Sequence, residues 1–134
     1  MRVIYAPRWS NIGQRDRAVF FAGSIDMGKA ENWQDKLADS VNDLPGVIFN
    51  PRRTDWDSTW IQDISNKKFN EQVTWELDHL DRADLIVYYF DPAGQAPITL
   101  LELGLHANSR ETDPFKQIVV CCPDGYWRKG NVKS

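Results

Sequence analysis

Cysteine and histidine are scarce in this sequence. The two cysteines, Cys121 and Cys122, are adjacent. Neighbours on a strand point to opposite faces and rarely bridge each other, so we expect two reduced thiols at the end of a buried strand. The two histidines, His79 and His106, have no partner at metal-ligand spacing and are expected to be ordinary helix residues. The sequence therefore predicts neither a disulfide framework nor a metal site.

Long apolar runs and basic blocks are also missing. No apolar run approaches the roughly 18 residues of a membrane span, and the opening residues, MRVIYAPRWS, are too short and too polar for a secretory signal. The formal net charge is −3, with no basic stripe, which argues against a large nucleic-acid footprint. We expect a cytoplasmic protein that contacts neither membranes nor polymeric nucleic acid, with residues 1–134 forming one domain.

Apolar runs that suit strands alternate with segments of helical periodicity. We expect strands at 18–22, 46–50, 84–90 and 117–122, and helices at 30–43, 67–82 and 97–108. This alternation is typical of a parallel sheet built from right-handed βαβ units. Residues 2–5 form either a short extra strand or an edge segment. No helix is expected after the last strand, so one face of that strand is expected to need cover from a partner subunit.

A single carboxylate interrupts the most apolar of these helices, APITLLELGLHA (96–107). Apolar residues cover nearly every direction around its axis, which predicts a buried helix. Glu102 lies in the middle, and an unpaired carboxylate in an apolar setting is costly unless it is paired, protonated or useful. The alternative is that Glu102 points to solvent.

Several polar residues follow the expected strands directly. In open α/β sheets, ligands bind beyond the carboxyl ends of the strands. The candidates at this rim are Gly23, Ser24, Ile25, Asn50, Arg52, Asp91 and Glu102. Two carboxylates in one crevice, Asp91 and Glu102, suit displacement at an anomeric carbon, where one attacks and the other handles the proton of the leaving group.

Most of these residues have an ordinary structural alternative. Asp91 begins DPAG, which is also a good turn sequence. Arg52 and Arg53 suit carboxylate or phosphate groups, or else pair with Asp55, Asp57 or a carboxylate on the next helix. Gln72 and Glu76, four apart on the helix 67–82, either border the crevice or lie on a solvated face. Trp56 and Trp60 either stack on a base or cover the core.

Five segments in this order resemble the nucleoside 2-deoxyribosyltransferase-like family. They are FFAGSID, NPRR, FNEQVTWELDHLDRADLIVYYF, LLELGLHA and GYWRKGNV, and they run from about residue 19 to residue 132. The resemblance implies an α/β flavodoxin-like three-layer fold with a four- to five-stranded parallel sheet. It also implies N-glycosidic bond chemistry on nucleosides or nucleotides, with neither a metal nor an organic cofactor.

The resemblance also implies roles for individual residues. Glu102, in the ELG motif, is implied to be the nucleophile, Asp91 to contact the base, and Glu76 to lie near the base or sugar. The turn at 23–25 is implied to hold the 5′ end of the sugar. Asn131 is the candidate for a residue that completes the site of a neighbouring subunit in a homo-oligomer. Two features depart from the family pattern: the loop PAGQAPIT, and the expected lack of a C-terminal helix.

Together these features predict an enzyme. The expected reaction is cleavage or transfer at the N-glycosidic bond of a (deoxy)nucleoside through a covalent glycosyl-enzyme on Glu102, with Asp91 assisting departure of the base and Trp56 or Trp60 stacking against it. The alternatives are a hydrolase of 2′-deoxynucleoside 5′-monophosphates and a nucleotide-binding sensor that does no chemistry.

Overall fold

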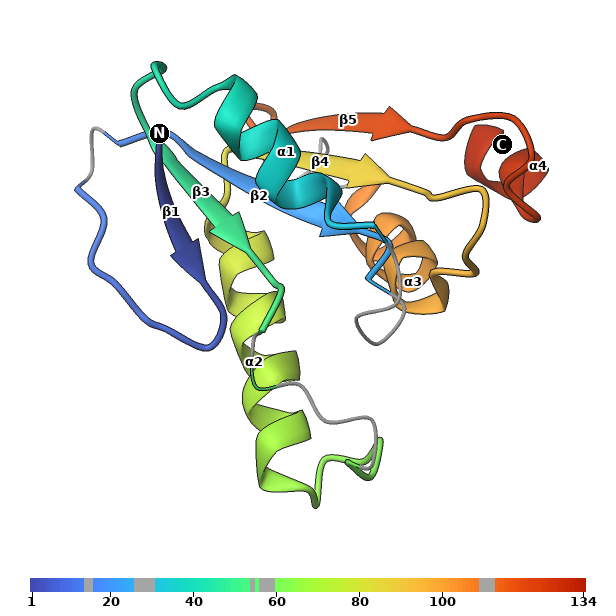
Figure 1. Cartoon of the computed structure of the whole chain (residues 1–134), viewed down its shortest axis with the longest axis horizontal. Helices are drawn as coiled ribbons and strands as arrows, with labels where there is room; N and C mark the ends of the chain where they lie inside the picture. The colour runs from blue at the N-terminus through green and yellow to red at the C-terminus, as the bar shows by residue number, and fades with distance from the viewer. Residues whose placement is uncertain (14–15, 26–30, 54, 56–59, 109–112) are drawn as a thin grey trace.

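The computed structural model describes residues 1–13, 16–25, 31–53, 55, 60–108 and 113–134. Its centre is a five-stranded, all-parallel sheet with the order β1-β3-β2-β4-β5 (Figure 1). The strands are β1 (Arg2–Tyr5), β2 (Ala18–Gly23), β3 (Val47–Asn50), β4 (Leu85–Tyr89) and β5 (Gln117–Cys121). This confirms the α/β flavodoxin-like fold, and residues 2–5 form an edge strand.

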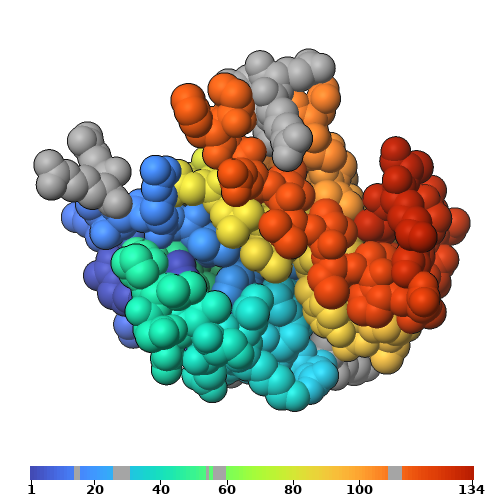
Figure 2. Space-filling view, turned by 90° about the horizontal axis from the view of Figure 1, so that it is seen from above, coloured from blue at the N-terminus to red at the C-terminus, as the bar shows by residue number. Residues whose placement is uncertain are grey.

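Helices cover both faces of this sheet. They are α1 (Trp33–Ser40), α2 (Lys67–Arg82), α3 (Pro97–His106) and the short α4 (Lys129–Lys133). The side chain of Ala38 in α1 packs against Phe21 and Ile48 on one face. Trp75 of α2 lies in the larger core on the other face, against which α3 also packs. Viewed from above, the N-terminal residues (blue) and the C-terminal segment (red) lie on opposite sides of the molecule, with the cyan segment between them (Figure 2).

The strand order fixes where the chain reverses direction across the sheet. After β2 the chain passes through α1 to β3 on one side, and after β4 it passes through α3 to β5 on the other. β2 and β4 are neighbours, with Phe20 opposite Ile86 and Gly23 opposite Tyr89. The crevice beyond their carboxyl ends is therefore the switch point, where doubly wound sheets bind ligands.

Local sequence explains where the helices begin. The side chain of Asn32 accepts a hydrogen bond from the backbone of Asp35 at the start of α1, and that of Asn66 accepts one from Phe69 at the start of α2. Asparagine is among the best residues for this position. Pro97 opens α3, where its missing N–H costs nothing. α2 has the predicted bounds, whereas α1 and α3 are shorter than the predicted 30–43 and 97–108.

The expectation that no helix follows the last strand was wrong. Residues after β5 form α4, and the segment before it is attached to the loop that precedes α3. The hydroxyl of Tyr126 donates to the carbonyl of Gln95 at 2.5 Å, and the indole N–H of Trp127 donates to the same carbonyl at 3.1 Å. The buried Tyr126 ring also packs against Phe90.

The buried face of α2 differs from the predicted stripe of Phe69, Val73, Leu77 and Leu80. Leu77 is 44% exposed, while the buried positions are Gln72, Trp75, His79 and Leu80. A strict spacing of four drifts around a helix of 3.6 residues per turn. The Trp75 and His79 rings stack at 4.0 Å, and the indole of Trp75 donates to the carbonyl of Arg8. Trp75 and His79, whose rings carry polar nitrogen atoms, are thus buried on α2 in place of part of the predicted apolar stripe.

Exposure of α3 and β5 also differs from expectation. α3 was predicted to be buried all round, yet Ile98, Leu101 and Leu105 are exposed, because only one side of the helix packs on the sheet. β5 was predicted to be a buried strand, yet it is an edge strand on which Val119 and Cys121 are exposed. Both cysteines are free thiols, as predicted.

Candidate functional site

A pocket of about 1050 Å³ opens at the carboxyl ends of the central strands. Its walls come from the carboxyl-terminal half of β2, from the loop after β3, from the first half of α2, and from the β4–α3 loop and α3. The size suits a small organic ligand. The sequence-predicted residues that line it are Gly23, Ile25, Arg52, Glu76, Asp91 and Glu102.

Two carboxyl groups from different helices meet in this pocket. Glu76 of α2 and Glu102 of α3 are joined by a side-chain hydrogen bond. Glu102 is only 9% exposed, so the solvent-facing alternative is excluded. Since carboxylates this close cannot both ionise easily, the hydrogen bond requires that one of them carries a proton.

Burial sets the acidity of the pair. It is the main reason that the pKa of Glu102 lies well above the ordinary value for glutamate, and the charge of Glu76 and the hydrogen bond to it add to the rise. Burial also raises the pKa of Glu76, but there the hydrogen bonds from Gln72 and Glu102 act in the opposite direction. The pair therefore keeps a proton at pH values where an isolated glutamate has lost it.

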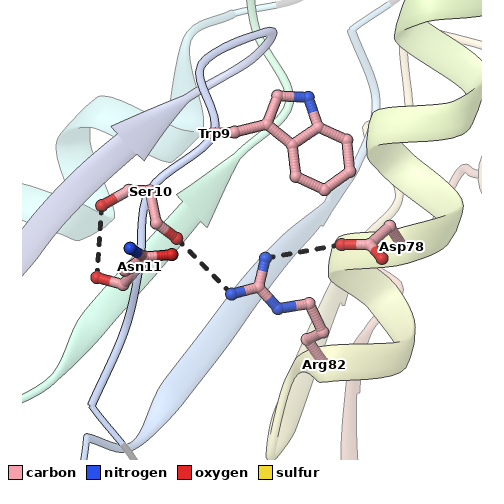
Figure 3. Close-up of a pocket in the computed structure, with 5 residues that line it drawn as sticks. All are labelled: Trp9, Ser10, Asn11, Asp78 and Arg82. Carbon is pink, nitrogen blue, oxygen red and sulfur yellow. Dashed lines mark hydrogen bonds and ion pairs between the residues drawn. The ribbon is translucent and has the colours of Figure 1, made fainter.

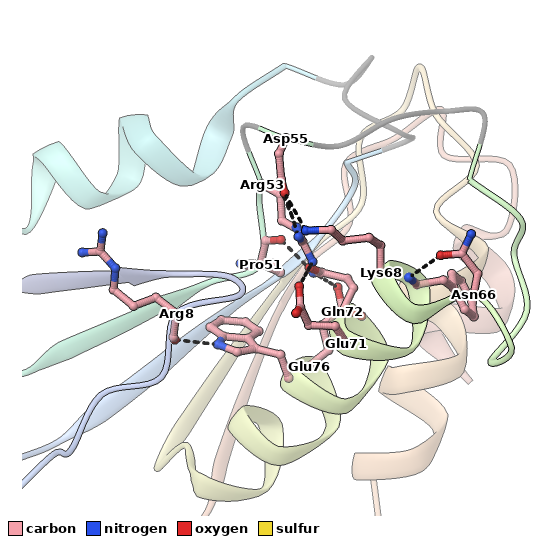
Figure 4. Close-up of polar contacts among 11 residues, drawn as sticks. Arg8, Pro51, Arg53, Asp55, Asn66, Lys68, Glu71, Gln72 and Glu76 are labelled. Atoms are coloured by element: carbon pink, nitrogen blue, oxygen red, sulfur yellow. Dashed lines mark hydrogen bonds and ion pairs between the residues drawn. The ribbon is translucent and has the colours of Figure 1, made fainter.

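A chain of polar contacts leads from the protein surface to Glu76 (Figure 4). Nε2 of Gln72 donates to Oε1 of Glu76 at 2.9 Å and to the carbonyl of Pro51 at 2.9 Å. Arg53 donates to Oε1 of Gln72 at 3.5 Å. The guanidinium of Arg53 is itself held by Asp55, at 2.8 and 2.9 Å, and by Glu71, at 3.0 Å. This confirms the structural alternative for Arg53, which pairs with Asp55 and with a carboxylate of the next helix.

Asp91 lines the pocket but also shapes the turn that follows β4. Its Oδ1 accepts a hydrogen bond from the backbone of Ala93 at 2.9 Å, so the turn alternative for DPAG is confirmed. Asp91 and Glu102 share one pocket, as the strand order implied, while the hydrogen-bond partner of Glu102 is Glu76. For the contact between Gln72 and Glu76, the available sequence signal was their spacing of one helical turn.

The turn after β2 ties the two central strands together. Ser24 is fully buried: its backbone donates to the carbonyl of Tyr89 at 3.0 Å, and its hydroxyl accepts from the backbone of Asp91 at 2.9 Å. A Cβ on Gly23 would overlap the Tyr89 backbone and the ring of Trp33, so only glycine fits there. Ile25 is half-buried in the pocket wall.

The residues after β3 are held mainly by structural contacts. Asn50 is fully buried, and its side chain accepts from the backbone of Arg52 at 3.0 Å. The guanidinium of Arg52 lies in the pocket wall and donates to Gln34 at 2.7 Å and to the carbonyl of Glu31 at 2.6 Å.

The two other predicted site residues are Trp56 and Asn131. Trp56 falls outside the residues that the structure describes. Asn131 is exposed on α4 and is not among the residues that line the pocket of its own chain.

A second, smaller hollow of about 390 Å³ lies beside the C-terminal half of α2 (Figure 3). Arg82 donates to Asp78 at 3.4 Å and to the carbonyl of Ser10 at 3.5 Å. The ring of Trp9 packs against that of His79 at 4.9 Å. These contacts dock the β1–β2 loop on α2, and we assign no chemistry to them.

The described part of the chain offers no metal site and no membrane-spanning helix. None of its His, Cys, Asp and Glu residues form a group of three or more that could hold a metal ion. None of the helices seen in those residues combines the length and the apolar character needed to cross a bilayer.

Comparison with known proteins adds to this picture. A search of curated proteins finds no match. The family model described as nucleoside 2-deoxyribosyltransferase like, by contrast, matches residues 16–126, which include both central strands, the residues that line the pocket apart from Tyr5, and the Glu76–Glu102 pair. The chain therefore belongs to the nucleoside 2-deoxyribosyltransferase-like family.

Proposed function

We propose that the protein cleaves or transfers at the N-glycosidic bond of a deoxynucleoside through a covalent glycosyl-enzyme on Glu102. The observation that carries this proposal is the hydrogen-bonded pair of Glu76 and Glu102 in a ligand-sized pocket. Two carboxyl groups that share a proton provide both a nucleophile and an acid, which are the two groups that displacement at an anomeric carbon requires.

The first half of the reaction needs the shared proton to move. As positive charge develops at C1′, it favours the ionised form of Glu102, so the proton passes along the hydrogen bond to Glu76. A carboxylate oxygen of Glu102 then forms a bond to C1′. The C1′–N bond breaks with its electron pair going to the base nitrogen, and Glu76 protonates the base directly or through water.

The second half returns the pair to its initial state. Glu76, now ionised, takes a proton from the incoming water or acceptor base, which attacks C1′ and releases Glu102. Two displacements at the same carbon retain its configuration. Water as the acceptor makes the protein a hydrolase, and a second base makes it a transferase.

Asp91 is assigned to the base and not to proton transfer. Sequence reasoning gave Asp91 the task of assisting the leaving base. The direct hydrogen bond between Glu76 and Glu102 favours Glu76 for that task, because one Asp91 oxygen is already used by the backbone of Ala93. Gly23 and Ile25 in the wall of the pocket are assigned to the sugar.

We also assign the exposed stripe of α3, formed by Ile98, Leu101 and Leu105, to contact with a second copy of the chain. Leu101 is 69% exposed, and a contiguous apolar stripe of this kind typically marks an interaction site. Ile98 belongs both to the stripe and to the wall of the pocket. A second copy packed on the stripe would therefore also border the substrate.

The test is turnover of a panel of deoxynucleosides, with the free base followed by chromatography. Glu102→Ala is expected to abolish release of the base, and acid-quenched wild-type protein is expected to carry a deoxyribosyl mass adduct that the variant lacks. Asp43→Ala, which removes an exposed carboxylate, is the matched control and is expected to behave like wild type. Undiminished turnover by Glu102→Ala would rule out the nucleophile. Adding an acceptor base separates transfer, which yields a new nucleoside, from hydrolysis, which yields free sugar.

A further inference from the structure

Gln72 donates a hydrogen bond to one member of the carboxyl pair, and the reaction above gives it no role. Its side-chain amide is buried, and both of its N–H groups are used, one by the carbonyl of Pro51 and one by Glu76. Its oxygen accepts from Arg53. An amide can be fitted in two orientations, but here Pro51 can only accept and Arg53 can only donate. The orientation of the Gln72 amide is therefore determined.

This orientation favours the ionised form of Glu76. Because Gln72 must point an N–H at Oε1 of Glu76, that oxygen must be the acceptor and cannot carry the proton. A hydrogen bond donated to a carboxylate favours its ionised form. Gln72 makes no such contact with Glu102, so the two members of the pair are not equivalent.

We propose that Gln72 is a positioning residue: held by Arg53 and Pro51, it keeps Glu76 as the hydrogen-bond acceptor, so that the proton of the pair starts on Glu102. This inference rests on the proposed function. Its consequence for the reaction is that Glu76 is a weak base and hence a strong acid once it has received the proton, which suits transfer to a departing base. The resting protein then holds its nucleophile in the unreactive, protonated form until a substrate is bound.

The surroundings of the pair contain few other groups that bear on this proton. Tyr88, from β4, uses its hydroxyl to donate to the backbone carbonyl of Glu102, and burial raises the pKa of that hydroxyl, so it stays neutral. Asp91 lines the same pocket from the β4–α3 loop. Arg53 lies behind Gln72 and is neutralised by Asp55 and Glu71.

The experiment replaces Gln72 by Met, which keeps the length of the side chain and removes the donor. Losing a hydrogen bond to a charged group is expected to raise the pH of the acidic limb of kcat/KM by about one unit. Gln72→Leu also lacks the donor, adds no charge beside the pair, and is expected to shift the limb in the same direction. It decides the matter if the Met variant does not fold. Gln34→Met removes another buried glutamine amide away from the pair and is expected to leave the limb where it is.

A readout that does not depend on turnover separates this inference from the proposed function. The ¹³C-carboxyl resonances of labelled Glu76 and Glu102 report the titration of the pair directly. In Gln72→Met the first proton is expected to leave at higher pH than in wild type. An unchanged titration in that variant would overturn the role of Gln72, whatever the activity. If no deoxynucleoside is turned over but the titration shifts, the proposed reaction fails and the positioning role stands.

Discussion

The hydroxyl of Ser24 accepts a hydrogen bond from the backbone N–H of Asp91 at 2.9 Å, joining the ends of the two central strands at the edge of the pocket. Ser24 follows β2 and Asp91 follows β4, and the serine is fully buried. The hydroxyl thus fixes how far the two turns lie apart. Ser24, which the sequence analysis assigned to the sugar, and Asp91, which it assigned to the base, are therefore held together by this hydrogen bond.

Ser24→Ala is therefore expected to destabilise the protein. It leaves the backbone N–H of Asp91 without its partner, and an unsatisfied buried donor costs about 1–3 kcal/mol. Urea unfolding measures the change in the free energy of unfolding. Ser40→Ala is the control, because the Ser40 hydroxyl bonds a backbone carbonyl on the exposed surface of α1, and a loss of under about 0.5 kcal/mol is expected there. Equal losses in the two variants would contradict the role of Ser24.

Glu102→Gln is expected to change how stability depends on pH. The folded-state pKa values of Glu76 and Glu102 are both raised, mainly by burial. In the folded protein the pair therefore binds more protons than in the unfolded chain, so the stability that the pair contributes is highest below the unfolded value of about 4.3 and falls as the pH rises through the raised values.

Removing one carboxyl removes one titrating group and its repulsion, so this fall should flatten in Glu102→Gln. Urea midpoints measured between about pH 4 and pH 9 test it. Asp43→Asn is the control and should retain the wild-type slope. A Glu102→Gln variant with the wild-type dependence on pH would show that the pair does not share a proton.

Uncharged deoxynucleosides are expected to be better substrates than their 5′-monophosphates. Glu31, Asp35 and Asp91 line the pocket together with the carboxyl pair, whereas the lining cations in the described part of the chain are Arg52 and Arg53. Arg53 is already matched by Asp55 and Glu71, and Lys68 contacts Asp55 at 3.8 Å, so this group has no net positive charge to attract a phosphate.

Repulsion from this lining should lower kcat/KM for the phosphorylated compound by about tenfold or more at low salt, and the difference should shrink as salt is added. Parallel assays of matched pairs at two ionic strengths provide the measurement. Faster turnover of the monophosphates at low salt would contradict the prediction and would favour the monophosphate hydrolase.

Leu101→Lys, in the exposed stripe of α3, is expected to dissociate an oligomer. A lysine placed on an apolar contact between copies must be desolvated without a partner. Light scattering after size-exclusion chromatography should show a smaller species for Leu101→Lys. The control, Ile64→Lys, changes another exposed aliphatic residue and should leave the mass unchanged. A wild-type protein that is already monomeric at high concentration would contradict the proposal.

The sequence predicted the sheet and the rim of the pocket more reliably than it predicted helix faces. Continuous apolar runs identify strands with both faces covered, and strand order then brings Glu102 and Asp91 to one pocket. The hydrogen bond between Glu102 and Glu76 was not predicted, because the buried face of α2 was assigned to its stripe of apolar residues. Trp75 and His79 fill the buried face instead, and that rotation brings Gln72 and Glu76 toward the pocket.

The end of the chain escaped prediction for a different reason. α4 is too short to leave a periodic signal, and its position depends on distant contacts. Tyr126 and Trp127 are separated by more than 30 residues in sequence from their shared acceptor, Gln95. Contacts of this kind arise from tertiary packing and carry no local pattern.

Those two contacts attach the C-terminal segment to the wall of the pocket. Gln95 lines the pocket and directly precedes the turn into α3, the helix that carries Glu102. A change of ring at Tyr126 or Trp127 would therefore alter the tilt at which α3 presents its carboxyl group to Glu76. Substitutions in this segment are therefore expected to change the distance between the carboxyl groups of Glu76 and Glu102 without changing either residue.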